Sequence, residues 1–239
     1  MTLNLKNRLK AFKHRTHWLS NFTDGAPKAI CYQISSKFKP DLVGQGSYKN
    51  TPLAFRKGDL QALEEVLILE EYDFITEVLQ ESKTPVIFDI GAHIGTFALW
   101  CFSKNKGAQI LSLEADPETF AVLSQNRKTA DKPAWTILNR AGWSSDETLS
   151  FRNSGATMSH KVAEDGEIKV QGITLADLMK QVNTKNIDVL KIDIEGAEFD
   201  ILDSNTINFL SKNTKQICVE FHDFLVRDNR YKIRLKEIF

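Results

Sequence analysis

Carboxylates stand at or near the ends of two apolar segments of the sequence. Asp89 lies one residue before the end of the apolar run Val86–Ile90, where packing alone would favour an apolar residue, and Glu114 lies near the end of Ile110–Ala115. Glu114 follows a glycine turn by about 20 residues, the place where an acidic side chain accepts hydrogen bonds from the two hydroxyls of a ribose. These positions predict a site for a nucleotide-like ligand.

Two later segments carry their polar residues on a single face. Lys191, Asp193 and Glu195 alternate with apolar residues, and Glu220 and His222 do the same further along the chain. Because successive side chains of a strand point to opposite faces, each set shares one face. A structural Lys–Asp ion pair explains Lys191, but it does not explain why Asp193 and Glu195 lie at the carboxyl end of the strand. Burying such charges without partners is costly. If the two strands are neighbours, these polar tips converge, as a general base or a divalent-cation site requires.

A turn framed by two glycines follows the first apolar run. Gly91 and Gly95 come directly after Val86–Ile90, and Thr96–Lys106 reads as a helix with Gly107 at its C-terminal cap. Strand, glycine turn and helix together present a helix N-terminus at the carboxyl edge of an open α/β sheet. The turn therefore predicts where the nucleotide-like ligand binds.

Strands and helices alternate along the core of the chain, which predicts an α/β fold with a doubly wound, mostly parallel sheet. The last segment, from Arg230 to Phe239, is expected to begin one more helix. The expected core strands are Val86–Ile90, Ile110–Ala115, Trp135–Ala141, Asp188–Ile194 and Gln216–His222.

Local signals place two helix starts and a pair of outlying strands. Asp116 precedes Pro117, an N-cap followed by proline at the first helical position, and Thr174 starts another helix. Thr148–Arg152 and Ile168–Ile173 are expected to pair as strands around a loop at 153–160 that is rich in Ser, Gly and Thr. Such a loop either binds a ligand or is merely mobile.

The N-terminal part is harder to interpret. Leu3–Trp18 has the spacing of an amphipathic helix, and Ala29–Ile34 and Leu53–Arg56 look like short strands. We divide the chain into an N-terminal extension, residues 1–80, and a ligand-binding domain, residues 81–239. The extension either folds over the carboxyl edge of the sheet as a cap or only adds stability.

Composition limits the classes of function. The 239 residues include 31 basic and 31 acidic side chains, so no overall charge favours nucleic acid. Residues 1–17 contain no acid, which predicts a solvated basic helix and leaves an anionic partner as the alternative. No apolar run has membrane-spanning length, and the three cysteines lack metal-ligand spacing. We expect a cytoplasmic protein with buried reduced thiols at Cys101 and Cys218.

Two motifs together resemble a known family. The sequence Asp-Ile-Gly-Ala-His-Ile-Gly at 89–95, paired with Leu-Lys-Ile-Asp-Ile-Glu-Gly-Ala-Glu at 190–198, is similar to the FkbM-type methyltransferases, and the similarity spans Phe55 to His222. The resemblance implies a Rossmann-like class I methyltransferase fold. It also implies S-adenosyl-L-methionine as cofactor and methylation of a hydroxyl on a sugar, polyketide or other small metabolite.

The resemblance also assigns roles to residues. Those implied to hold the cofactor are Asp89, Gly91, Ala92, His93, Gly95, Glu114, Ala141 and Gly142. Those that act on the acceptor are Asp193, Glu195 and His222, although paired carboxylates could instead hold a divalent cation. His93 departs from the family, which more often has Asn there. The closing antiparallel hairpin of the class I sheet is expected to be absent, which would leave the fifth strand as a bare edge. In that case another segment covers the edge, a partner chain covers it, or the chain is truncated.

Two other functions stay open. A nicotinamide-dependent oxidoreductase shares the ribose-binding acid but requires glycine at position 93, where this chain has His93. A binding protein that has lost methyltransferase activity would keep the fold without the polar strand tips. We expect a small hydroxylated acceptor as partner, neither nucleic acid nor a membrane, and the sequence leaves a homo-oligomer open.

Overall fold

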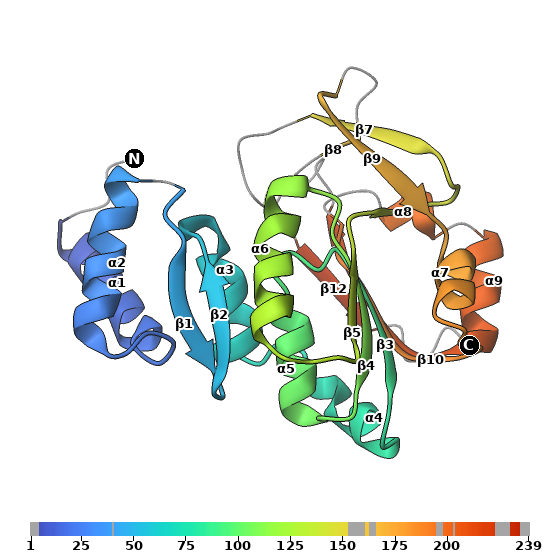
Figure 1. Cartoon of the computed structure of the whole chain (residues 1–239), viewed down its shortest axis with the longest axis horizontal. Helices are drawn as coiled ribbons and strands as arrows, with labels where there is room; N and C mark the ends of the chain where they lie inside the picture. Colours follow the sequence, from blue (N-terminus) through green and yellow to red (C-terminus); the bar gives the residue numbers. More distant parts are fainter. Residues whose placement is uncertain are drawn as a thin grey trace.

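The main sheet has the order β12-β11-β10-β3-β4-β5 (Figure 1). The computed structural model describes residues 5–39, 41–152, 161–162, 166–194, 198–202, 204–222 and 230–234. The strands of this sheet are β3 (Val86–Ile90), β4 (Gln109–Leu113), β5 (Trp135–Leu138), β10 (Ile187–Ile192), β11 (Thr214–His222) and β12 (Arg230–Arg234). The first five of these strands are parallel. The predicted α/β, mostly parallel fold is therefore confirmed.

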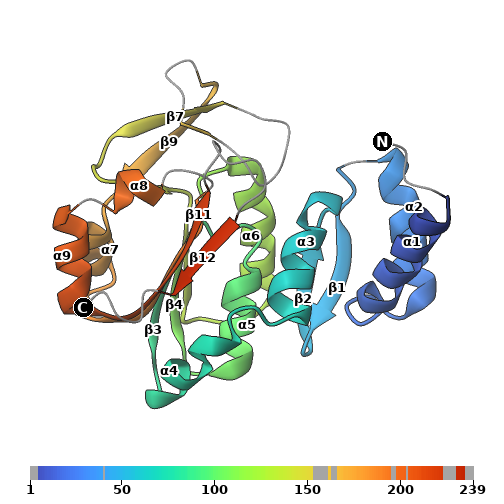
Figure 2. The same cartoon turned by 180° about the vertical axis from the view of Figure 1, so that it is seen from behind.

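The edge beside β11 differs from the expectation. Arg230–Arg234 form β12, an antiparallel partner of β11 in which Val219 lies opposite Ile233, so the predicted final helix is wrong at these residues. Figure 2 shows β12 alongside β11. Of the alternatives that we considered for this edge, covering by another segment of the chain is the one present, and it satisfies the open hydrogen-bonding groups of β11.

Helices cover both faces of the main sheet (Figure 1). One face carries α4 (Thr76–Glu81), α5 (Thr96–Lys104) and α6 (Pro117–Thr129), and the other carries α7 (Leu175–Gln181), α8 (Glu198–Ile201) and α9 (Ser204–Asn213). The predicted caps are confirmed, because Asp116 accepts from the Thr119 N–H and Thr174 accepts from the Asp177 N–H. These caps fix the residues at which α6 and α7 begin. They therefore also fix where the loops that follow β4 and β9 (Ile168–Ile173) end.

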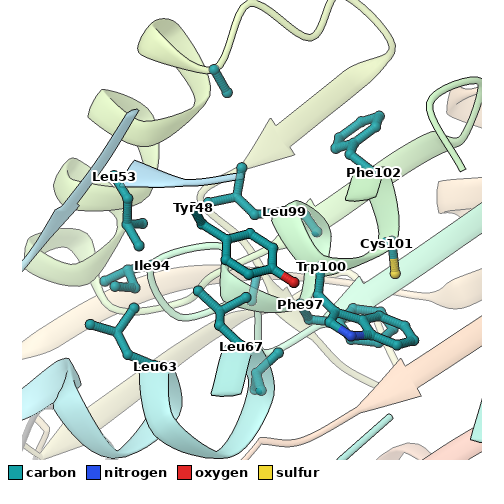
Figure 3. Packing of buried hydrophobic residues seen from close by; sticks show 14 of the residues in the cluster. Tyr48, Leu53, Leu63, Leu67, Ile94, Phe97, Leu99, Trp100, Cys101 and Phe102 are labelled. Carbon is teal, nitrogen blue, oxygen red and sulfur yellow. The ribbon is translucent and has the colours of Figure 1, made fainter. Parts of the chain in front are cut away.

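The core on the α5 face is aromatic (Figure 3). The rings of Phe97 and Trp100 stack with centroids 6.2 Å apart, and Tyr72 packs edge-on against Phe97 at 4.8 Å. Cys101 is buried in the same cluster, and Cys218 is buried as well, so both thiols are buried as predicted. This packing fixes the start of α5 against the sheet.

The end of α5 corrects one detail. The helix stops at Lys104 with Asn105 as its C-cap, two residues before the predicted end. Gly107 therefore does not cap it. A Cβ atom on Gly107 would lie 2.1 Å from the carbonyl oxygen of Lys83, so glycine is required there by a close backbone approach.

A second sheet has the order β6-β9-β7-β8. Its strands are β6 (Ala141–Gly142), β7 (Thr148–Arg152), β8 (Lys161–Val162) and β9 (Ile168–Ile173). The predicted antiparallel pairing of the strands at 148–152 and 168–173 is confirmed. The predicted strand Trp135–Ala141 is instead divided between the two sheets. The loop at 153–160 lies outside the described residues.

Residues 5–39 and 41–75 form two long helices, a hairpin and a set of short helical turns. In chain order these elements are α1 (Leu5–Leu19), α2 (Ala26–Phe38), β1 (Gly44–Tyr48), β2 (Thr51–Phe55), η1 (Lys57–Asp59), α3 (Leu60–Ala62), η2 (Leu63–Ile68) and η3 (Asp73–Ile75). The predicted strand at Ala29–Ile34 is wrong, since these residues lie within α2, which buries Ala29, Tyr32, Gln33 and Ser36.

The β1–β2 hairpin packs on α6 through one buried amide. Asn126 accepts from the Ala54 N–H at 2.7 Å and donates to the carbonyls of Ala54 at 3.0 Å and Ile94 at 2.8 Å. In Figure 1, α1 and α2 lie beyond this hairpin, at the end of the molecule away from the main sheet. The division at residue 80 stays a prediction. Within the described ranges, no helix is both long and apolar enough to cross a membrane.

Candidate active site

The glycine turn lies where β3 and β10 end. Gly91 has φ +82°, and a Cβ atom there would lie 1.7 Å from the carbonyl oxygen of Asp193. The Asp193 N–H donates to the Ile90 carbonyl at 3.0 Å. Only glycine fits this position, because the backbone of β10 passes directly beside the turn. Asp193 is thereby held next to the turn.

Glu114 supports the turn from the tip of β4. Its carboxylate accepts from the backbone N–H of His93 at 2.7 Å and of Asp116 at 2.9 Å. Burial raises the pKa of Glu114 to about 7, against the opposing influence of His93 and the two N–H donors. The predicted strand-tip position is correct, since Glu114 directly follows the last residue of β4.

The side chain of His93 contacts a residue that sequence reasoning missed. Its Nε2 lies 3.0 Å from Oδ1 of Asp59, which is fully buried and also bound by Arg56 at 3.1 Å. Burial opposes the ionised form of Asp59, but His93 and Arg56 together hold its pKa below the ordinary value. Asp59 is the N-cap residue of α3, but its side chain makes no capping hydrogen bond to that helix. Its side chain instead bonds back to Arg56 and orients His93.

One ring nitrogen of His93 has no partner. Nδ1 is buried and has no hydrogen-bond partner in the described part of the chain. His93 has φ +52°, in the left-handed region that a side chain seldom occupies. A strained residue with an unpaired polar atom at a glycine turn is typical of a ligand-binding position.

Lys191 lies at the centre of a buried ionic cluster. Its Nζ is 3.4 Å from Asp89 and 3.3 Å from Asp193, and it donates to the Gly91 carbonyl at 2.9 Å. Burial opposes the charge on Lys191, but the attraction of Asp193 and Asp89 holds its pKa above the ordinary value. Burial raises the pKa of Asp89 in spite of Lys191. The structural role that we considered for Lys191 is thus present.

A small cavity of about 40 Å³ opens beside the turn. It is lined by Ala62, Glu65, Val66, Glu71, Tyr72, Gly91, Ala92, His93, Thr96, Phe97, Lys191, Asp193 and Glu220. Four of these residues are carboxylates and one is a lysine. Burial raises the pKa of the Tyr72 hydroxyl, and Asp193, Glu71 and Glu220 raise it further. The cavity therefore favours a positively charged group.

The segment that closes this cavity comes from the N-terminal extension, after the hairpin. Glu65 and Val66 belong to η2, a π-helical turn, a geometry that is often found at functional sites. No residue of 5–39 or 41–50 lines the cavity. At about 40 Å³ the cavity is far smaller than the pockets of about 300–1,000 Å³ that hold small-molecule ligands.

The remaining predicted site residues are placed as follows. Asp89 is fully buried in the sheet and bonded by the Ser112 hydroxyl, and Gly95 is the N-cap of α5, packed against Trp135. Ala141 and Gly142 form β6, where a Cβ atom on Gly142 would lie 2.5 Å from Ile90. None of these four residues lines the cavity; they support the turn and the strand ends around it.

The predicted catalytic residues are only partly described. Asp193 and Glu220 reach the same cavity from β10 and β11, which are neighbours as we expected. Glu195 lies outside the described residues, and so does the side chain of His222, whose backbone ends β11 opposite Arg230. In the described ranges, no group of three or more His, Cys, Asp or Glu is arranged to hold a metal ion.

Comparisons with known proteins agree with this geometry. A family model described as a methyltransferase FkbM domain matches residues 89–235. The hexuronic acid methyltransferase AglP of Haloferax volcanii is 32% identical over 171 residues, 68% of this chain and 69% of that protein. The 2-O-methyltransferase NoeI of Sinorhizobium fredii is 25% identical over 174 residues, 65% of this chain and 71% of that protein.

One solved structure has the same name as the family model. The crystal structure of the methyltransferase FkbM from Methylobacillus flagellatus KT is 16% identical, with a TM-score of 0.43 over 82% of this chain and 48% of that one. The chain thus spans about half the length of that protein. The family match covers more than half of the 239 residues and includes both predicted motifs. The chain belongs to the FkbM methyltransferase family.

Proposed function

We propose that this methyltransferase uses S-adenosyl-L-methionine to methylate a hydroxyl of a sugar, polyketide or other small metabolite. The observation that carries the proposal is the acidic cavity at the glycine turn, which is lined by four carboxylates, Glu65, Glu71, Asp193 and Glu220, and by one lysine, Lys191. The cofactor has a sulfonium and an ammonium group, and a cavity with excess carboxylate attracts such cations.

The residues of the turn fit the cofactor. Gly91 lets the turn pack directly against the backbone of Asp193, and the unpaired Nδ1 of His93 offers a hydrogen bond to a ligand. Glu114 would hold the ribose hydroxyls, with Ala92 at the cavity wall and Ala141 beside the adenine. Asp89, Gly95 and Gly142 would act by holding this arrangement in place. When bound, S-adenosylmethionine supplies an electrophilic methyl group.

The chain's own residues would orient the acceptor and take its proton. Methyl transfer is an in-line displacement, so positioning supplies much of the acceleration. The acceptor hydroxyl becomes acidic during attack and requires a base. Asp193 is about one-quarter exposed, with a side-chain exposure of 27%, and lies at the cavity beside Lys191, so its carboxylate can receive that proton. Glu195 and His222 stay proposed partners at the same edge.

The acceptor class rests on the relatives. One is named for hexuronic acid and another for 2-O-methylation, which supports a sugar hydroxyl for this chain. Paired carboxylates could still recruit a divalent cation that lowers the pKa of the acceptor. The proposed partner is thus a small hydroxylated molecule and the proposed location is the cytoplasm.

Ligand-dependent melting tests the proposal. S-adenosylhomocysteine should raise the melting temperature, because a ligand at a hundred times its Kd stabilises the folded state by about 2.7 kcal/mol. NAD should have no effect. A folded Glu114→Ala variant is the control and should lose most of the shift.

Transfer of labelled methyl groups to a panel of hydroxylated sugars then tests the chemistry, with and without a chelator. A shift with NAD alone would contradict the proposal and favour an oxidoreductase. Binding of S-adenosylhomocysteine without transfer to any acceptor would favour an inactive binding protein.

A further inference from the structure

Exposed apolar side chains are concentrated at the N-terminal end of the molecule. Seven large apolar residues of the described chain are exposed, and five of them lie between residues 9 and 43. They are Leu9 (55% exposed), Ile30 (38%), Ile34 (47%), Phe38 (82%) and Val43 (39%). Scattered exposed residues need no explanation, but a cluster on one small unit indicates a binding surface.

Three of these residues form a stripe along α2. Ile30, Ile34 and Phe38 recur every four residues, so they lie on one side of the helix. The opposite side of α2 is the buried one, formed by Ala29, Tyr32, Gln33 and Ser36. The exposed apolar side, formed by Ile30, Ile34 and Phe38, is called the outer stripe.

Positive charge surrounds the outer stripe. Residues 5–39 contain eight Lys and Arg residues and one acid, Asp24, although the whole chain is neutral. Lys28, Lys37 and Lys39 flank the stripe on α2, and all three are exposed. The basic helix α1 packs alongside, where Gln33 of α2 donates to the Thr16 hydroxyl.

The two helices run antiparallel. Lys37, near the end of α2, lies 5.5 Å over the ring of Phe12, whereas Gln33 meets Thr16 further along α1. Leu9 therefore lies toward the end of α2 that carries Phe38. The exposed Leu9 thus adds to the apolar surface at that end of the helix pair.

The shape of the molecule leaves this surface accessible. Figures 1 and 2 show α1 and α2 at one end of the long axis, with the main sheet at the other. A groove of about 570 Å³ lies between α2 and β1, with Phe38, Leu42 and Phe55 in its wall and Lys28 and Lys39 among its lining residues. Apolar walls together with cations suit an acyl chain that carries an anionic head group.

We propose that α1 and α2 dock the protein on an anionic lipid bilayer. Apolar side chains flanked by lysines are the pattern of helices that lie in the membrane interface, and each Lys or Arg near an anionic surface adds to the attraction. A protein partner would require acids complementary to this one-sided charge. The inference is independent of the proposed methyl transfer, and it replaces our expectation of no membrane partner.

Vesicle co-sedimentation tests the proposal on the full chain. The protein should bind phosphatidylcholine vesicles that contain phosphatidylglycerol and should not bind pure phosphatidylcholine. Raising NaCl from about 0.1 M to about 0.5 M should release it, because salt screens the attraction. The double variants Ile34→Ser/Phe38→Ser and Lys37→Glu/Lys39→Glu should each lose roughly tenfold or more in partitioning.

Matched controls come from α9. Ile207→Ser and Lys212→Glu change an exposed apolar residue (39%) and an exposed lysine on another helix, and both should bind like the wild type. Melting temperatures check that all variants fold, and the lysine changes touch no buried residue.

Three outcomes would overturn the proposal. They are no binding to anionic vesicles, equal binding to both kinds of vesicle, and equal losses in the α9 controls. A solution dimer that Ile34→Ser/Phe38→Ser dissociates, detected by light scattering, would also overturn it, because a second copy would then cover the stripe.

Discussion

Replacing Lys191 by methionine tests the buried ionic cluster. Methionine has a similar length and fills the same space, so the change removes charge and hydrogen bonds but leaves little cavity. Asp89, with no exposed surface, then loses the cation at 3.4 Å, and the Gly91 carbonyl loses its donor at 2.9 Å. The partly exposed Asp193 keeps access to water and should contribute less.

The expected loss of stability is large. Removing one partner of a buried ion pair costs about 3–5 kcal/mol, because the other charge stays buried without compensation. The cost has a pH dependence of known sign. Since burial raises the pKa of Asp89, the carboxyl takes up a proton more readily in the folded variant than in the unfolded chain. The deficit should therefore be smallest in acid and should grow as the pH rises through the folded pKa of Asp89.

Urea denaturation followed by tryptophan fluorescence measures this loss. With a slope of about 3 kcal/mol per molar urea, the midpoint should fall by about 1–2 M at neutral pH. The Asp89→Asn/Lys191→Met double variant removes both charges and should recover much of the loss. Lys215→Met is the matched surface control, because Lys215 also contacts two acids, Asp188 at 2.9 Å and Glu81 at 3.3 Å, but is half exposed. It should cost no more than about 1 kcal/mol.

Three results would refute the reasoning about this cluster. One is a loss for Lys191→Met no larger than for Lys215→Met. Another is a deficit that does not change with pH. The third is a double variant as unstable as the single one.

Other predictions concern binding, catalysis and folding. The affinity of the wild type for S-adenosylhomocysteine should fall by up to about tenfold per pH unit below pH 7, because Glu114, with its pKa raised to about 7, must lose a proton to hold the ribose. Calorimetry should show no such pH dependence for Glu114→Gln. If the affinities of the wild type and the variant change with pH in parallel, Glu114 is excluded from the site. Asp193→Asn should lower kcat by roughly two to four powers of ten with little change in cofactor affinity; normal turnover would remove Asp193 from catalysis. Asn126→Ala should lower the free energy of unfolding, measured by urea denaturation, by roughly 2–4 kcal/mol, because it leaves the N–H and carbonyl of Ala54 and the carbonyl of Ile94 without this hydrogen-bond partner. A smaller loss would mean that the hairpin docks by apolar contacts alone.

Local patterns in the sequence determined most of the main domain. The β-branched run before Gly91 forms β3, and the alternation around Lys191 and Glu220 places both side chains on one face of adjacent strands. The caps at Asp116 and Thr174 are where they were predicted. Each of these features depends on residues that are neighbours in the chain, so periodicity and capping chemistry are enough to find them.

Tertiary structure decided the rest. Segment 29–34 has the composition of a strand, but it is a helix because Ala29, Tyr32 and Ser36 pack at helical spacing against the hairpin. Arg230–Arg234 became a strand because β11 offered an open edge. Asp59 meets His93 across 34 residues, and the π-helical turn at 63–68 closes the cavity. No local pattern encodes such contacts, because they depend on the path by which the chain returns to the same place.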